Sequence, residues 1–181
     1  MILYIVRHGE TDYNVKHIIQ GVVNTNLNET GIRQAQNLKK EIDKLDIDLV
    51  IVSPLKRACE TASIITKDRD IEFIYDDRII ERNAGELEEK ADIYYDRDKA
   101  WNYQLNTDLD YNIETIRELL NRTNDFLNDL KRKYLDKKIL IVSHEATIRA
   151  LHYNIVGYNK DTDFKELKVD NCCLFKYKIE S

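Results

Sequence analysis

Apolar and polar residues alternate along the chain in blocks that predict strands and helices in turn. Continuous apolar runs, typical of strands buried on both faces of a sheet, occur at residues 2–6, 48–53, 71–75 and 138–143. Apolar residues at helical spacing predict helices at about 32–45, 55–67, 113–134 and 146–156. The alternation predicts a three-layer α/β/α sandwich with a mainly parallel sheet, and the run at 172–179 is predicted as an antiparallel edge strand.

The first predicted helix shows the pattern most clearly. Its apolar residues recur three or four positions apart and would face the sheet: Ile32, Ala35, Leu38, Ile42 and Leu45. Between the first strand and this helix, residues 12–28 are polar and irregular, with a turn expected at Gln20 and Gly21.

The segment 76–112 breaks the alternation of strands and helices. It is rich in acidic residues and tyrosines, carries the single tryptophan, Trp101, and has weak periodicity. We expect a short helix within it, at about 89–101, and a role as a cover over the strand ends. The alternative is a polar surface insertion without functional contacts, since long irregular connections are either functional or mobile.

Composition narrows the class of protein. With 181 residues the chain is expected to form one domain, 1–181, and its 28 Lys and Arg against 33 Asp and Glu give a formal charge of −5. Without a dense basic patch, nucleic acid is not expected as a partner, whereas a small anionic substrate is compatible with a few buried cations. No apolar run has the length of a membrane span and no signal pattern is visible, so a cytoplasmic protein without membrane association is expected. The cysteines, Cys59, Cys172 and Cys173, are interpreted as buried reduced thiols.

Three predicted strands end in residues of the same chemical kind. The first ends in Arg7 and His8, the second is followed by Arg57 one turn into the next helix, and the fourth ends in His144. The carboxyl ends of parallel strands meet at one edge of a sheet, where ligands bind. Two histidines and two arginines in one pocket would be costly without an anion, and a phosphoryl group would balance them.

These residues stand in motifs that resemble the histidine phosphatase superfamily, with its phosphoglycerate mutase-like fold, in branch 1. The motifs are Arg7-His8-Gly9-Glu10-Thr11 with Asn14, Leu27-Asn28-Glu29-Thr30-Gly31, Ser53-Pro54-Leu55-Lys56-Arg57-Ala58-Cys59-Glu60-Thr61-Ala62 and Ser143-His144. They follow one another in order over nearly the whole chain.

The resemblance implies roles for the residues at the strand ends. His8 would be the nucleophile that becomes phosphohistidine, and Arg7, Arg57 and His144 would hold the phosphoryl oxygens. It also places three residues near the substrate phosphate or its ester group: Asn14, Gln20 and Gly21. It implies neither a metal nor a cofactor.

The proton donor of the family corresponds to Glu81, which would protonate the leaving oxygen and then activate water. Two positions depart from the family pattern. Glu145 replaces the glycine that usually follows the second histidine, and Leu87-Glu88-Glu89 replaces the usual aromatic-Glu-Gly. We assign Glu145 to the substrate site, where we hypothesise that it disfavours polyanionic substrates.

The function favoured by these observations is a metal-independent phosphomonoesterase that acts on a small phosphorylated metabolite. A phosphoglycerate mutase-type phosphoryl transferase would use the same His8 and Glu81, but its longer basic insertion is replaced here by a short acidic segment. A phosphoprotein phosphatase is also compatible with the sequence. A non-catalytic phospho-ligand binding protein is disfavoured, because binding alone needs no proton donor such as Glu81. Exposed tyrosines and the edge strand would allow a homodimer. His17 and His152 receive no role.

Overall fold

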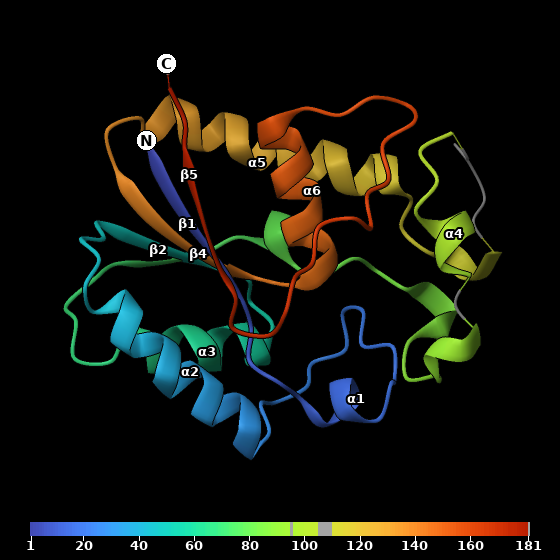
Figure 1. The fold of residues 1–181 in the computed structure, drawn as a ribbon, viewed down its shortest axis with the longest axis horizontal. Helices are drawn as coiled ribbons and strands as arrows, with labels where there is room; N and C mark the ends of the chain where they lie inside the picture. Colours follow the sequence, from blue (N-terminus) through green and yellow to red (C-terminus); the bar gives the residue numbers. More distant parts are fainter. Residues whose placement is uncertain (95, 105–109, 181) are drawn as a thin grey trace.

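The computed structural model describes residues 1–94, 96–104 and 110–180 of the chain. In this part of the chain the strands form one sheet in the order β3-β2-β4-β1-β5 (Figure 1). Their bounds are Ile2–Arg7 for β1, Leu49–Val52 for β2, Phe73–Tyr75 for β3, Lys138–Ser143 for β4 and Leu174–Lys178 for β5. All pairings are parallel except that of β1 with β5. The predicted sheet, with its antiparallel edge strand, is confirmed. The homodimer that this edge would allow stays a prediction.

Helices cover both faces of the sheet (Figure 1). The side chains of β1 alternate between them: Leu3 and Ile5 pack in the cluster that includes α5 (Ile116–Lys133) and α6 (Glu145–Val156). Tyr4 and Val6 pack against α2 (Glu29–Ile42) and α3 (Lys56–Ile65). Each sheet face thus has its own apolar core, and the predicted three layers are confirmed.

The helices begin where polar side chains satisfy their first backbone N–H groups. Asn28 accepts the N–H of Gly31, so α2 begins at Glu29 rather than at residue 32. Thr115 and Glu118 form a capping box, which starts α5 at Ile116 rather than at residue 113. Ile32, predicted to face the sheet, is 39% exposed, because Gly31 occupies the buried position of that first turn.

Two irregular segments contain more local structure than the sequence predicts, or a different kind. The short helix α1 (Asp12–Val15) lies inside the stretch expected to be irregular. The single helix expected at 89–101 is wrong: the chain forms a 3₁₀ turn at Asp92–Tyr94 and the short helix α4 (Arg97–Ala100). Glu89 has a φ of 64°, and a right-handed helix does not include such a backbone. Further 3₁₀ turns lie at Asp77–Ile79, Gly85–Leu87 and Asp110–Asn112.

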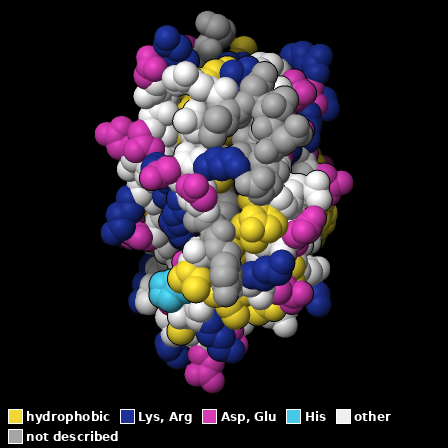
Figure 2. All heavy atoms as spheres, turned by 90° about the vertical axis from the view of Figure 1, so that its right-hand side faces the viewer, with side chains coloured by type: hydrophobic (Ala, Val, Ile, Leu, Met, Phe, Trp, Pro, Cys, Tyr) yellow, Lys and Arg dark blue, Asp and Glu magenta, His cyan; other side chains and the backbone are white. Residues whose placement is uncertain are grey.

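The surface on the α4 side of the molecule mixes side chains of both charges. Figure 2 shows basic, acidic and hydrophobic side chains interspersed among the described residues on that face. Residues 95 and 105–109 of the expected cover segment lie outside the described residues. No helix in the described ranges has both the length and the apolar character that a membrane crossing requires. The three cysteines are free thiols and are half-buried rather than fully buried.

Candidate active site

The carboxyl ends of β1 and β4 lie side by side, because Arg7 pairs with Ser143 in the parallel register. The N–H of His8 donates to the carbonyl of Ser143 at 3.0 Å, and this brings together the two histidines that follow these strands. The ring centroids of His8 and His144 are 5.2 Å apart. Arg57, in the first turn of α3, places its Nε 3.3 Å from Nε2 of His8. The four groups at the strand ends therefore form one cluster.

The imidazole of His8 is held in one orientation and is 1% exposed. Its Nδ1 lies 2.7 Å from the carbonyl oxygen of Gly9, which can only accept a hydrogen bond, so we assign the ring proton to Nδ1. Nε2 then keeps a lone pair. Burial lowers the pKa of His8 well below its usual 6.5, and the charges of Arg57 and Arg7 lower it further. The arrangement presents a neutral ring nitrogen that can act as a nucleophile.

The turn that follows His8 is fixed by a close approach of two glycines. A Cβ on Gly9 would lie 2.6 Å from the carbonyl oxygen of Gly31, and a Cβ on Gly31 would lie 2.1 Å from that of Glu10. The N–H of Gly9 also donates to the hydroxyl of Thr61 at 3.0 Å. The N-terminal turn of α2 is thus pressed against the backbone that carries His8.

Arg57 is completely buried, and backbone carbonyls hold its guanidinium. Its two terminal nitrogens donate to Val23 at 2.7 Å and to Gly21 at 2.8 Å. Gly21 therefore contributes its carbonyl to Arg57, and its φ of 48° favours glycine. The amide oxygen of Gln20 accepts the hydroxyl of Thr25 at 2.7 Å. Gln20 and Gly21 both line the cavity beside His8.

Arg7 and Glu145 are paired at the edge of the site. Arg7 donates through NH1 to the carbonyl of Val169 at 2.6 Å, and its NH2 lies 3.1 Å from the Glu145 carboxylate. The other carboxylate oxygen of Glu145 lies 3.0 Å from Arg149. The carboxylate that replaces the usual glycine therefore points toward Arg7, and Glu145 lines the cavity.

Two buried nitrogens of the cluster have no hydrogen-bond partner among the described residues: Nε of Arg7 and Nδ1 of His144. The opposite ring nitrogen of His144 contacts the hydroxyl of Ser53 at 2.7 Å. Burial lowers the pKa of His144 well below its usual value, as do the charge of Arg57 and, to a smaller extent, its neighbours His8 and Arg7. Both nitrogens therefore have an unused hydrogen-bonding position, and Arg7, unlike His144, also lines the cavity beside His8.

Glu81 lines the same cavity, and its carboxylate points at the N-terminus of α6. It accepts the N–H of Arg82 at 2.9 Å, of Thr147 at 3.3 Å and of Ala146 at 3.4 Å. Because His144 makes no side-chain cap, Glu81 supplies acceptors to the first turn of this helix. Burial raises the pKa of Glu81, against the opposing effect of the Arg82 N–H and Arg57. The carboxyl can therefore carry a proton at a higher pH than an exposed one.

The cavity has a volume of about 370 Å³, which suits a small molecule. Its outer wall combines apolar and charged side chains: Tyr13, His17, Ile18, Ile19, Arg82, Asp92, Arg97, Trp101 and Ile113. The guanidinium carbons of Arg82 and Arg149 lie 5.1 and 5.5 Å from the centroid of the Trp101 ring. The described part of the expected cover segment thus contributes directly to the cavity.

Asn14 and Asn171 complete the inner wall. The side-chain oxygen of Asn14 accepts the N–H of Thr11 at 3.1 Å in the capping box of α1. Asn171 donates to the carbonyl of His8 at 3.0 Å, and sequence reasoning missed it, because no periodicity or motif marks the loop before β5. The only sequence signal for the outer wall was the lone Trp101. Among the described residues, no group of three or more His, Cys, Asp or Glu side chains stands close enough to hold a metal ion.

The stretch Leu87-Glu88-Glu89 joins two loops around the site. The Glu88 carboxylate accepts the N–H of Val22 at 2.9 Å and of Ala84 at 3.2 Å. Glu89 occupies a left-handed backbone position, where glycine costs least, and accepts the hydroxyl of Tyr13 at 2.8 Å. Glu88 and Glu89 therefore connect this stretch to Tyr13, Val22 and Ala84.

Comparisons with known proteins agree with this geometry. The chain is 35% identical over 175 residues to the uncharacterized phosphatase PhoE of Bacillus subtilis, covering 94% of this chain and 84% of that protein. It is 32% identical over 177 residues to the probable phosphoglycerate mutase GpmB of Escherichia coli, covering 95% of this chain and 82% of that protein. The crystal structure of the alpha-ribazole phosphatase from Shigella flexneri superposes with a TM-score of 0.87 at 29% identity, covering 99% of this chain and 91% of that one.

A family model matches residues 3–181, and these residues include every member of the cluster around His8. The chain belongs to the histidine phosphatase superfamily, branch 1.

Proposed function

We propose that the protein hydrolyses phosphomonoesters of small metabolites through a phosphohistidine on His8. The observation that carries the proposal is that His8, with Nδ1 held by Gly9 and a lone pair left on Nε2, lines the same cavity as the buried carboxyl of Glu81. A neutral imidazole nitrogen is the group that can attack phosphorus, and a carboxyl with a raised pKa can supply a proton to the leaving oxygen.

In the first step, Nε2 of His8 attacks phosphorus, the ester P–O bond breaks, and Glu81 gives its proton to the departing alkoxide. The Nδ1–H remains donated to Gly9, so the phosphorylated ring is oriented by the backbone. Arg57 exchanges its contact with Nε2 for a phosphoryl oxygen. Arg7 and His144 bind the remaining oxygens through the two buried nitrogens that lack a partner in the described chain.

In the second step, the carboxylate of Glu81 takes a proton from water, the water oxygen attacks phosphorus, and the P–N bond breaks. Inorganic phosphate leaves, and His8 and Glu81 return to their starting protonation states. Asn14, Gln20, Gly21 and Glu145 line the surroundings of the phosphoryl group. The segment 76–112 covers the site through Trp101, which favours a small substrate over a phosphoprotein.

The alternative, phosphoryl transfer of the phosphoglycerate mutase type, uses the same two groups and is supported by the likeness to GpmB. It differs in the fate of the phosphohistidine, which passes its phosphoryl group to a second hydroxyl instead of to water. The acidic segment around the site favours hydrolysis, because a mutase must retain a bisphosphate. The free thiols favour a reducing compartment, such as the cytoplasm, for the reaction.

The test is phosphate release from a panel of phosphomonoesters in the presence of a chelator. Native protein should release phosphate, His8→Ala should release none, and His152→Ala should match the native protein, because His152 contacts Tyr177 away from the cavity. Equal release by the native protein and His8→Ala would overturn the assignment of the nucleophile. Interconversion of phosphoglycerates without phosphate release would favour the mutase alternative.

A further inference from the structure

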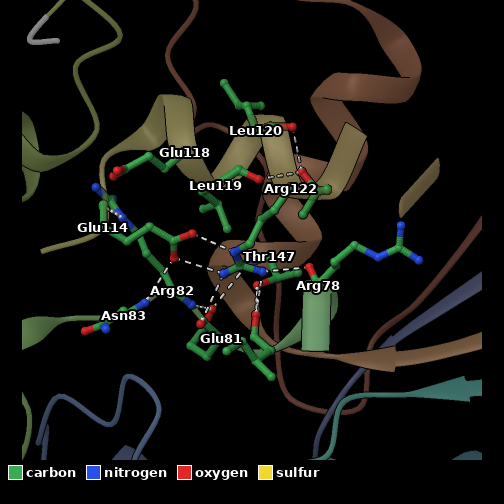
Figure 3. Close-up of polar contacts among 12 residues, drawn as sticks. Arg78, Glu81, Arg82, Asn83, Glu114, Glu118, Leu119, Leu120, Arg122 and Thr147 are labelled. Carbon is green, nitrogen blue, oxygen red and sulfur yellow. Dashed lines mark hydrogen bonds and ion pairs between the residues drawn. The ribbon is translucent and has the colours of Figure 1, made fainter. Parts of the chain in front are cut away.

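The segment 78–81, which leads from β3 to Glu81, is held by side chains at its backbone carbonyls (Figure 3). Arg122, in the middle of α5, donates to the carbonyl of Arg78 at 2.7 Å, of Ile80 at 3.1 Å and of Glu81 at 3.2 Å. The carbonyl of Ile80 also accepts the hydroxyl of Thr147. One guanidinium thus contacts three of the four carbonyls in the segment that ends at the proposed acid.

Arg122 is itself fixed by Glu114, which stands before α5. The two side chains form a bidentate pair, with Nε at 2.6 Å and NH2 at 2.9 Å from the carboxylate oxygens. Together with the three carbonyls, this pair gives each of the five N–H donors of Arg122 an acceptor. The side chains of Arg122 and Glu114 are only 20% and 14% exposed. A lysine has no planar fork and does not reproduce this geometry.

Glu114 also holds the chain on the far side of Glu81. Its carboxylate accepts the N–H of Asn83 at 3.1 Å, its own N–H donates to the carbonyl of Asn83 at 2.9 Å, and its carbonyl accepts Nε of Arg82 at 2.6 Å. Arg122 and Glu114 therefore restrain the backbone on both sides of Glu81. Figure 3 shows Arg122 and Glu114 on one side of this backbone and Thr147 of α6 beside it.

We propose that Arg122, fixed by Glu114, is the positioning residue for the proton transfers of Glu81. The inference rests on the proposed function of Glu81. Arg122 does not line the cavity that holds His8, so its hydrogen bonds act on the reaction through the segment that they hold. Its charge also contributes to the lowered pKa of His144, and Arg122→Lys retains that charge. A displacement of the carboxyl by about 1 Å is sufficient to cost on the order of 10²-fold in rate. The steps that need Glu81 should therefore suffer when Arg122 is replaced, and the attack by His8 should not.

The experiment compares esters that differ in their need for an acid. An alkyl phosphate such as glycerol phosphate needs protonation of its leaving oxygen, whereas p-nitrophenyl phosphate has a leaving group that departs as an anion. We expect Arg122→Met to lower kcat/KM for the alkyl ester by about 10²-fold, within the usual contribution of general acid catalysis. For the nitrophenyl ester, kcat/KM should fall less than about tenfold, and an initial burst of one nitrophenolate per chain should appear because water activation is slowed.

Arg78→Met is the matched control. Arg78 belongs to the same segment, but its side chain pairs with Asp76 and Asp129 rather than with Glu81. It should show neither the leaving-group dependence nor the burst. Arg122→Lys keeps the charge near His144 but loses the planar guanidinium. It should therefore show the same leaving-group dependence and the same burst as Arg122→Met. It also serves as the test variant should Arg122→Met fold poorly.

A double-mutant cycle that combines the Arg122 variants with Glu81→Gln distinguishes a positioning role from a general disturbance of the folded structure. Once Glu81 cannot carry a proton, replacing Arg122 should cause no further loss on the alkyl ester. An equal loss on both esters, or a further loss in the Glu81→Gln background, would overturn the positioning role. Full activity of Arg122→Met and Arg122→Lys would overturn it as well. A Glu81→Gln variant that itself lacks leaving-group dependence would instead refute the proposed acid, and the inference with it.

Discussion

A decrease in pH from 7.5 to 5 should destabilise the folded protein through His8 and His144, and replacement of either histidine should remove about half of this effect. Both imidazoles are buried, at 1% and 0% exposure, and burial beside arginines lowers both pKa values well below 6.5. In the unfolded chain both rings take up protons near pH 6.5, while the folded protein holds them neutral. Because the unfolded state then binds more protons, stability falls as the pH falls.

The unfolded pKa sets the full size of the effect, which is reached when both rings stay neutral in the folded protein over this pH range. At pH 5 each histidine favours the unfolded state by about 2 kcal/mol relative to pH 7.5, and the pair by about 4 kcal/mol. Glu81 acts in the opposite direction, because its pKa is raised above 4.5 in the folded protein. The stability it contributes is present at low pH and is lost as the pH rises through its folded pKa. This contribution cancels when the native protein is compared with a histidine variant.

The assay is urea unfolding between pH 5 and pH 7.5 without phosphate, since a bound anion would stabilise the native state. His8→Asn keeps an amide nitrogen near the carbonyl of Gly9, and His144→Gln keeps a polar group near the hydroxyl of Ser53. Each variant should lose about 2 kcal/mol less than the native protein over this range. Identical pH dependence in all three proteins would show that the folded histidines titrate normally. His8 would then be protonated in mildly acidic solution, and a neutral nucleophile would not be available there.

Three further substitutions test the surroundings of the site. Gly31→Ala places a Cβ 2.1 Å from the carbonyl oxygen of Glu10 and should cost about 1–3 kcal/mol, or about 2–4 °C in Tm per kcal/mol; an unchanged Tm would contradict the close approach. Arg57→Lys should lower kcat by about 10²–10³-fold, because the donors to His8 and to the phosphoryl group are lost with the fork; a loss below tenfold would contradict this role. Glu145→Gly should raise turnover of bisphosphates relative to monophosphates, and an unchanged ratio would contradict the charge hypothesis.

The sheet was predictable because its signal is local and strong. Runs such as Ile139-Leu140-Ile141-Val142 are apolar on both faces, and in the structure these residues are completely buried between two helix layers. The ends of helices depend on single side chains. Because Asn28 and Thr115 cap α2 and α5, these helices begin three residues away from their predicted starts at 32 and 113. The helix expected at 89–101 is replaced by two short elements, Asp92–Tyr94 and Arg97–Ala100, and nothing in the residue type of Glu89 predicts the positive φ that excludes it from a helix.

The residues at the chemical centre of the site could be predicted from the sequence for a different reason. Arg7, Arg57 and His144 stand at or just after strand ends, and parallel strands bring their ends to one edge. The roles of supporting groups depend on contacts between distant segments, which leave no periodic signal. The family resemblance implies that Gly21 lies near the substrate, which stays a prediction, and the structure adds that its carbonyl accepts a hydrogen bond from Arg57. Arg122 lies on the polar part of a strongly amphipathic helix, so the sequence pattern predicts only an ordinary surface arginine there.

The most direct test of the account is the identification of the covalent intermediate. Glu81→Gln, which cannot activate water efficiently, should accumulate label from radiolabelled p-nitrophenyl phosphate, whose leaving group needs no acid, during a short incubation with a chelator. After quenching in alkali, where a phosphorus–nitrogen bond persists, peptide mapping should find about one phosphoryl group per chain on His8. The same protein carrying His8→Ala should bind none. Label on another residue, or phosphate release by native protein without any labelled histidine, would contradict the central claim.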